Sequence, residues 1–258
     1  MELTVIGCHG GETPRHRTSA FVLDRRLAID AGSLTSGMEI EEQLALEAAV
    51  VSHAHLDHIR DLATIADNRC QGGKVGKLAL PIGATKQTIA TLKRHFFNNK
   101  LWPDFSKIPS PDLPTIRWVE LPMERSVRIG SYEVLAIPVS HTIEAAALLV
   151  RGAEGSILYS GDTGPTSRLW EVLREVQDLR AVLMEVSFPN HEQKVASLSG
   201  HHTPRTLAVD LKKLVKPKDV PTVLFHMKPM HQAEVERECA ALKGLNLSVA
   251  KLGERYRF

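Results

Sequence analysis

Three histidines and an aspartate lie within six positions of this chain: His53, His55, Asp57 and His58. The apolar run 49–51 directly precedes them, and apolar residues then recur at helical spacing over 56–68. This order predicts a buried strand that ends at the cluster and a helix that follows it. Core packing has no use for closely spaced polar groups of this kind. The cluster therefore predicts a chemical site on a strand-to-helix loop.

The rest of the chain alternates between strand-like and helical patterns. Strand-like runs occupy 3–7, 19–23, 26–30, 48–52, 77–82, 117–121, 126–130, 132–139, 145–150, 156–160, 181–187, 222–227 and 247–252. Helical runs occupy 38–48, 56–68, 84–97, 166–176, 203–215 and 230–244. Blocks of strands followed by alternating strands and helices, in both halves, predict an α/β (α+β) fold with two mixed sheets packed together and helices outside.

The sequence predicts one domain that carries one peripheral insertion. Prolines gather in 101–114, where they oppose both a helix and a central strand. We interpret about 84–115 as a peripheral insertion. The sequence contains no solenoid repeat, low-complexity tract or heptad run. The economical prediction is a single domain over residues 1–258.

Composition narrows the class of protein. The chain is 43% hydrophobic and 24% charged, which is ordinary for a globular protein. A net charge of +2 does not argue for a nucleic-acid partner. No apolar stretch is long enough to span a bilayer and the N-terminus lacks a secretory pattern, so we predict no membrane association and a cytoplasmic location. The three cysteines, Cys8, Cys70 and Cys239, lack CxxC spacing and predict reduced thiols.

Further polar groups follow other predicted strands. They are His141 after 132–139, Asp162 after 156–160 and His226 within 222–227. Taken singly, each is more typical of a loop or capping residue. Because loops at one edge of a sheet converge, these groups and the cluster could together surround one or two divalent cations. A nitrogen and oxygen donor set without cysteine indicates a catalytic site that leaves room for water.

The motif HAHLDH resembles the HxHxDH signature of the metallo-β-lactamase superfamily, and the later histidines and aspartate match its remaining metal positions in order. The resemblance covers nearly the whole chain and implies a four-layer αβ/βα sandwich. It implies two divalent ions, with zinc favoured and manganese or iron as alternatives. His53, His55 and His141 would hold one ion, Asp57, His58 and His226 the other, and Asp162 would bridge them.

Five further segments are similar to the class II 3′,5′-cyclic-nucleotide phosphodiesterases. They are TSAFVL with AIDAGS, the extended HAHLDH segment, FFNNKLWPDFS, EVSFPN, and SGHHTP with HMKP. The segment SGHHTP departs from that family because His202 stands where an apolar residue is frequent. The resemblance implies hydrolysis of a cyclic nucleotide such as cyclic AMP to the 5′-nucleotide, by attack of a metal-bridging hydroxide.

The predicted catalytic residues are Asp57, His201 and Glu185. His201 would donate a proton to the leaving oxygen and Glu185 would orient it, as in the related tRNA nucleases. The alternative for this pair is a capping loop and a strand-end carboxylate. Asp30 could hold a ligand histidine or simply form a turn. Trp102, Phe105 and His231 could touch substrate, although the two aromatic residues could equally fix the insertion to the core.

Two other function classes stay open at this stage. A tRNA 3′-processing endonuclease would share the ligands, His201 and Glu185, but the sequence has no long Gly- and Lys-rich arm to grip tRNA. A non-enzymatic metal or nucleotide sensor would have little need for seven ligand positions. The predicted partner is a small cyclic nucleotide, not a nucleic acid, and a homodimer stays open as the assembly.

Overall fold

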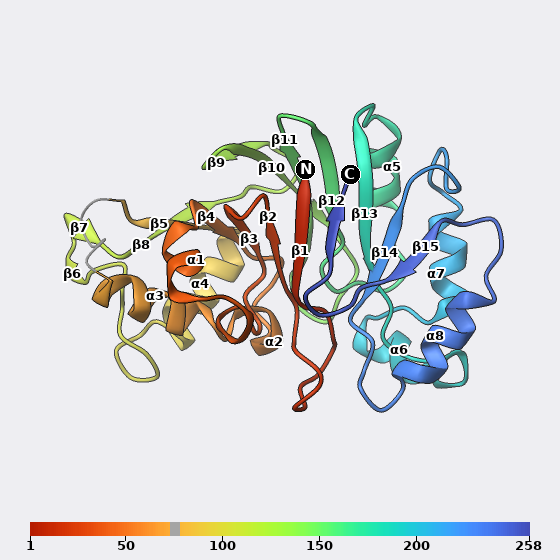
Figure 1. Cartoon of the computed structure of the whole chain (residues 1–258), viewed down its shortest axis with the longest axis horizontal. Helices are drawn as coiled ribbons and strands as arrows, with labels where there is room; N and C mark the ends of the chain where they lie inside the picture. The colour runs from red at the N-terminus through yellow and green to blue at the C-terminus, as the bar shows by residue number, and fades with distance from the viewer. Residues whose placement is uncertain (73–77) are drawn as a thin grey trace.

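The computed structural model describes residues 1–72 and 78–258 and contains two mixed seven-stranded sheets (Figure 1). The first sheet has the order β16-β1-β2-β3-β4-β5-β8, and the second has the order β15-β14-β13-β12-β11-β10-β9. A separate two-stranded hairpin joins β6 to β7. The predicted architecture, two mixed sheets in a metallo-β-lactamase-like sandwich, is confirmed.

The element bounds are as follows. The strands are β1 (Glu2–Gly7), β2 (Ala20–Leu23), β3 (Leu27–Ile29), β4 (Ala48–Val50), β5 (Leu80–Ala84), β6 (Pro109–Ser110), β7 (Leu113–Pro114), β8 (Ile116–Glu120), β9 (Val127–Ile129), β10 (Tyr132–Pro138), β11 (Ala146–Gly152), β12 (Gly155–Tyr159), β13 (Leu179–Glu185), β14 (Thr222–Phe225), β15 (Leu247–Val249) and β16 (Arg255–Arg257). The α-helices are α1 (Ile40–Ala45), α2 (Leu56–Ile59), α3 (Leu62–Gln71), α4 (Lys86–His95), α5 (Arg168–Arg174), α6 (Gln193–Ser199), α7 (Pro204–Leu211) and α8 (Gln232–Ala240).

The two sheets pack face to face through the alternate residues of their strands. Leu3 and Phe21 of the first sheet lie in one buried cluster with Tyr159 and Phe225 of the second. The Phe21 ring centroid is 5.6 Å from that of Tyr159 and 5.4 Å from that of Phe225. Burial of these aromatic rings supplies much of the apolar area that joins the halves.

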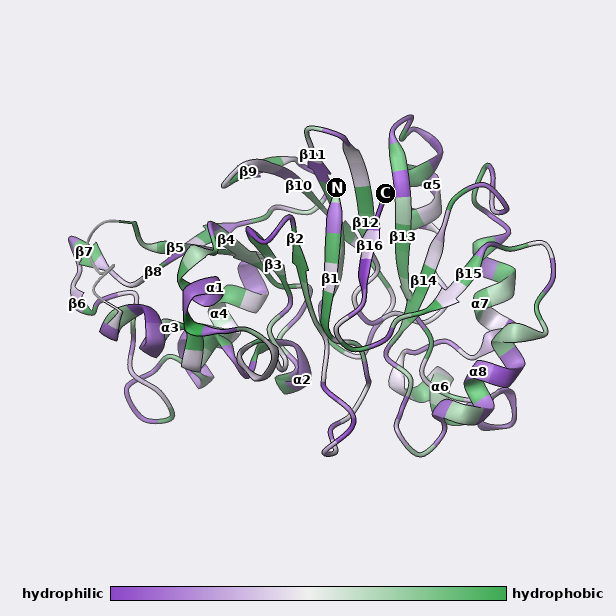
Figure 2. Cartoon of the chain, viewed as in Figure 1, coloured by the Kyte–Doolittle hydropathy of each residue, from purple (hydrophilic) through white to green (hydrophobic). Residues whose placement is uncertain are grey.

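Helices cover both outer faces. In Figure 1, α1, α3 and α4 lie on the outer side of the first sheet, and α5, α7 and α8 lie outside the second. Each layer has its own buried apolar cluster. Figure 2 shows the matching pattern, with hydrophobic strands and helices that carry both hydrophilic and hydrophobic residues. The short helices α2 and α6 lie at one edge of the sandwich, where the loops after several strands meet.

One local prediction is wrong. The helix predicted over 56–68 is interrupted between α2 and α3, because Ala31 makes hydrogen bonds on both sides of the break: its N–H donates to His58 O (2.7 Å) and its carbonyl accepts from Asp61 N (2.8 Å). Helix α6, which ends shortly before His201, and strand β16, which pairs with β1, were not predicted.

The segment predicted as an insertion, 84–115, contains α4 and the β6–β7 hairpin. Phe97 and Phe105 in this segment belong to the buried apolar cluster between the first sheet and its helices. No helix within 1–72 or 78–258 is long and apolar enough to cross a membrane. All three cysteines are free thiols.

Candidate metal centre

The seven predicted ligands meet at the edge of the sandwich where α2 and α6 lie. His53, His55, Asp57 and His58 follow β4, His141 follows β10, Asp162 follows β12 and His226 follows β14. The two sheets thus contribute ligands from both halves of the chain. Two groups of four ligand atoms form here, each with all atoms within 4.8 Å of one another, and Asp162 belongs to both groups.

The first group joins His53, His55 and His141 with Asp162. Nε2 of His53 and Nε2 of His141 each lie 3.1 Å from Nδ1 of His55. The Asp162 Oδ2 atom lies 3.7 Å from His53 Nε2. A tetrahedral ion with bonds of about 2.0–2.1 Å needs ligand atoms roughly 3.3 Å apart, so this spacing fits a cation such as zinc.

The second group joins Asp57, His58 and His226 with Asp162. His58 Nε2 lies 3.3 Å from Asp162 Oδ1, and His226 Nε2 lies 3.3 Å from Asp162 Oδ2. Asp57 Oδ2 lies 3.4 Å from His226 Nε2. Asp162 Oδ2 also lies 3.7 Å from His53 Nε2 of the first group, so this carboxylate faces ligands of both groups, as a bridge between two cations requires.

Unpaired buried atoms also fit a metal centre. Among the described residues, Nε2 of His58, Nε2 of His226 and Oδ1 of Asp162 are buried without a hydrogen-bond partner. An orphaned buried polar atom is costly, and three of them that point at one another indicate a ligand that the protein is built to hold. The residues present therefore fit two divalent cations, and these ligands would hold them.

The electrostatics of Asp162 and His53 match this donor set, whereas the carboxylates of Asp162 and Asp30 outweigh burial and raise the pKa of His58 well above its ordinary value. Burial opposes ionisation of Asp162, but the neighbouring His226 and His58 rings hold the pKa of its carboxyl well below the ordinary value. Burial, followed by the charge of His58, lowers the pKa of His53 well below its ordinary value. An ionised bridging carboxylate and an imidazole with a free nitrogen are the forms in which these groups bind metals.

In each histidine that would bind metal through Nε2, the other ring nitrogen, Nδ1, contacts a neighbouring polar group. Nδ1 of His53 contacts Ser52 Oγ (3.0 Å), and Nδ1 of His58 contacts Asp30 Oδ2 (2.6 Å). Nδ1 of His141 contacts the Gly200 carbonyl (3.0 Å), and Nδ1 of His226 contacts Ser187 Oγ (2.9 Å). Such contacts fix the tautomer and the ring orientation of a ligand. Of the two interpretations left open for Asp30, the structure shows the contact with a histidine.

Backbone conformation also places the ligands. Gly200 ends α6 in the left-handed region (φ 68°), and an added Cβ would lie 2.9 Å from His141 Cα. A side chain at this position would displace the carbonyl that holds His141. His226 (φ 71°) and Asp30 (φ 55°) adopt the same region without being glycine. This conformation costs about 1–3 kcal/mol at each residue and is typical of functional sites.

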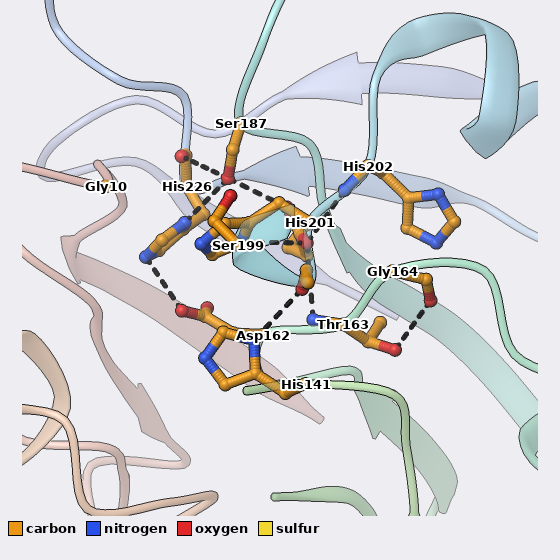
Figure 3. Close-up of polar contacts among 12 residues, drawn as sticks. Gly10, His141, Asp162, Thr163, Gly164, Ser187, Ser199, His201, His202 and His226 are labelled. Carbon is orange, nitrogen blue, oxygen red and sulfur yellow. Dashed lines mark hydrogen bonds and ion pairs between the residues drawn. The ribbon is translucent and has the colours of Figure 1, made fainter. Parts of the chain in front are cut away.

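His201 and Glu185 lie beside the second ligand group. His201 Nδ1 is 3.1 Å from Glu185 Oε1, and the His201 ring stacks on that of His226 with 5.2 Å between centroids. Glu185 is fully buried, and His201 keeps only 6% of its surface exposed. Figure 3 shows both histidines next to Asp162 and His141. The structure thus brings the predicted donor and its partner to the metal ligands.

Glu185 is held by several donors. Its Oε1 accepts from Thr163 N (3.2 Å) and His202 N (3.1 Å) as well as facing His201, and its Oε2 accepts from Ser187 Oγ (2.9 Å). Burial and then the charge of Asp162 raise the pKa of Glu185 to about 7, despite these contacts. Burial lowers the pKa of His201 to about 4. The burial that raises the pKa of Glu185 thus lowers that of the histidine it holds.

His202, the departure noted in SGHHTP, points away from the ligands into a buried polar network. Its Nδ1 contacts Thr206 Oγ1 (3.1 Å), and its Nε2 lies 3.7 Å from Asp210 Oδ2. Asp210 accepts hydrogen bonds from Thr166 N (2.9 Å) and Trp170 Nε1 (3.1 Å), and it pairs with Lys213. This network ties α7 to the loop that follows Asp162.

The Asp210→Ala change is expected to lower stability by about 3–5 kcal/mol, because it leaves buried donors and a cation without a partner. The melting temperature should fall by about 10 °C on the usual scale for a chain of this size. Thermal unfolding monitored by circular dichroism measures the effect. The control is Asp219→Ala, which removes an exposed carboxylate and should change little. Equal melting temperatures for the two variants would contradict the structural role.

The remaining candidates lie in different surroundings. Phe105 is 4% exposed and belongs to the apolar core, and Trp102 Nε1 donates to Ala63 O (3.1 Å), so both fix their segment to α3 and the first sheet. His231 precedes α8, with its ring 6.0 Å from that of Phe188. Sequence reasoning missed Ser52, Ser187 and the Gly200 carbonyl. A serine or a glycine beside a motif carries no signal that separates it from an ordinary loop residue.

Two ligand groups that share a carboxylate, at the edge of two packed mixed sheets, define the class as metal-binding hydrolases of the metallo-β-lactamase fold. Residues 26–227 match the family model described as a beta-lactamase superfamily domain. The chain belongs to the metallo-β-lactamase superfamily.

Relatives and solved structures narrow the comparison. The chain is 27% identical to a probable 3′,5′-cyclic-nucleotide phosphodiesterase of Yersinia pestis, covering 90% of this chain and 79% of that protein. It is 26% identical to a 3′,5′-cyclic-nucleotide phosphodiesterase of Aliivibrio fischeri, covering 88% and 81%. Unliganded yeast PDE1 has the same fold, with a TM-score of 0.81, 18% identity and 98% of each chain covered. The chain is thus a hydrolase-fold protein related to the class II cyclic-nucleotide phosphodiesterases.

Proposed function

We propose that this protein is a metal-dependent phosphodiesterase that hydrolyses 3′,5′-cyclic nucleotides, cyclic AMP among them, to 5′-nucleotides. The observation that carries the proposal is the contact of Glu185 with His201, whose ring stacks on His226 of the second ligand group. Figure 3 shows His201 and His226 side by side. The relatives from Yersinia pestis and Aliivibrio fischeri are named for this activity and align over most of their length.

The chemistry divides between the cations and the chain. Two bound divalent cations supply a nucleophile from water at neutral pH and stabilise the charge that develops on the phosphoryl oxygens. Rupture of the bond between phosphorus and the 3′ oxygen leaves an alkoxide that needs a proton. The His201 ring lies beside the second ligand group and donates that proton in this proposal, while Glu185 holds its Nδ1 and so directs Nε2 toward the leaving oxygen.

The sequence supports a small substrate, because it has no long Gly- and Lys-rich arm of the kind that would grip a tRNA. Human tRNase Z, short form, has the same fold with a TM-score of 0.72 and 15% identity, which leaves the endonuclease as the alternative to test.

The test is an incubation of protein loaded with zinc or manganese with cyclic AMP, beside a parallel incubation with precursor tRNA. Chromatography should show 5′-AMP and no RNA cleavage. Bis(p-nitrophenyl) phosphate serves as a general substrate that reports whether the metal centre is assembled. Hydrolysis of this substrate and of RNA, with inert cyclic AMP, would reject the proposed substrate in favour of the endonuclease.

A further inference from the structure

Two buried serines occupy matching places in the two halves of the metal centre. Each lies next to a metal ligand in space, and each is 0% exposed. Ser52 lies between His53 and Asp30, and Ser187 lies between His226 and Glu185. In both cases a hydroxyl connects the Nδ1 atom of a ligand histidine with a buried carboxylate.

The number of protons on each group determines which atom donates in each hydrogen bond. A serine hydroxyl has one proton to donate and lone pairs to accept others. Ser187 Oγ can donate to Glu185 Oε2 (2.9 Å) or to the His226 carbonyl (3.2 Å), and the carboxylate is both nearer and the stronger acceptor. Its lone pair then accepts the proton on His226 Nδ1 (2.9 Å). His226 is left with a free Nε2, the atom that faces Asp57 and Asp162.

The two carboxylates differ in what else they hold. Asp30 accepts from Ser52 N (2.8 Å), from Tyr159 OH (2.7 Å) and from the second metal ligand His58 (2.6 Å). All of its partners therefore serve the fold or the metals. Glu185 instead faces His201 through its Oε1 (3.1 Å). The chain of contacts in the second half thus runs from a metal ligand to the proposed proton donor.

We propose that Ser187 is a positioning residue that couples the orientation of the metal ligand His226 to that of the Glu185–His201 pair. Without its hydroxyl, His226 Nδ1 loses its acceptor and Glu185 Oε2 loses its side-chain donor. The His226 ring and the Glu185 side chain can then rotate more freely. Ser52 has no such double role, because none of the partners of Asp30 is the proposed proton donor to the leaving oxygen. The part of the inference that concerns the orientation of His226 is independent of the proposed function. The part that concerns proton transfer to the leaving oxygen rests on it.

The test compares Ser187→Ala with Ser52→Ala, a matched loss of one buried hydroxyl. The first measurement is the affinity for zinc by competition with a chelator, with the metal content of the loaded protein as the readout. Loss of an orienting contact typically weakens metal binding about 10- to 100-fold. Both variants should show a loss of this size for one of the two ions.

The second measurement separates the two roles at saturating metal. Bis(p-nitrophenyl) phosphate has a leaving group that departs without a proton, whereas the 3′ oxygen of cyclic AMP needs one. Ser187→Ala should reduce kcat for cyclic AMP at least about tenfold more than kcat for bis(p-nitrophenyl) phosphate, because it also disturbs the donor. Ser52→Ala should reduce both by the same factor. Ser187→Thr, which keeps the hydroxyl, should restore most of the difference.

The outcomes are distinct. Wild-type zinc affinity in Ser187→Ala would overturn the inference. Weaker affinity with equal losses on both substrates would overturn the coupling, because Ser187 would then serve the metal ligand alone. If the wild-type protein hydrolyses bis(p-nitrophenyl) phosphate and not cyclic AMP, the proposed substrate is wrong. The zinc affinities of the two serine variants then still decide whether Ser187 orients His226.

Discussion

Asp162→Ala is expected to lose both bound cations at micromolar metal and to reduce phosphodiesterase turnover at least about a thousandfold. The reason is geometric: this carboxylate faces His53 of the first ligand group as well as His58 and His226 of the second, and Asp162 is the residue common to both groups. Metal content by mass spectrometry and hydrolysis of bis(p-nitrophenyl) phosphate measure the two effects. Added zinc should raise the melting temperature of the wild-type protein and not that of the variant, because only the wild type binds it tightly.

The matched control is Glu12→Ala, which removes an exposed carboxylate that pairs with Arg60 outside the ligand groups. It should keep both the metals and the activity. A variant Asp162→Ala that retains two ions would contradict the bridging role. The same experiment tests the sensor alternative, since a sensor would lose metal with this change but would show no turnover in the wild-type protein.

Much of the fold was predictable because the strand and helix patterns in the sequence are strong. The apolar run before His53 does form a buried strand, and each later ligand follows a strand as its neighbours in sequence indicate. The errors arose where tertiary hydrogen bonds override local pattern. The break between α2 and α3 depends on Ala31, which lies far back in the sequence, and β16 forms only because β1 offers it an edge.

Four of the predicted ligands were accessible from sequence, because the closely spaced His53, His55, Asp57 and His58 have no packing explanation. His141, Asp162 and His226 were accessible only because strand-end loops converge and because the chain resembles a known family. Apart from that of Asp30, the supporting contacts were not accessible. Ser52, Ser187 and the Gly200 carbonyl each contact a predicted ligand histidine at hydrogen-bond distance. Nothing in the sequence around them indicates this role. His202 illustrates the opposite case: a histidine beside the site whose side chain belongs to a buried network with Asp210.

His201→Ala is expected to reduce kcat for cyclic AMP by about 10² to 10³, while the content of bound metal stays at two ions. The loss should be small for bis(p-nitrophenyl) phosphate, whose leaving group needs no proton. His201→Ala removes a ring that stacks on His226. His226 keeps its separate contact with Ser187 Oγ, so the metal ligands should stay in place. Equal losses on both substrates would reassign proton transfer to water.

The pH dependence gives a second, independent expectation for the same pair. Burial raises the pKa of Glu185 to about 7 and lowers that of His201 to about 4, so below pH 7 the pair holds a proton and above pH 7 it loses it. A donor must be protonated, and kcat for cyclic AMP should therefore fall as the pH rises through about 7. The fall should be absent from the His201→Ala profile and from the wild-type profile with bis(p-nitrophenyl) phosphate, and its persistence in either would show that another group supplies the proton.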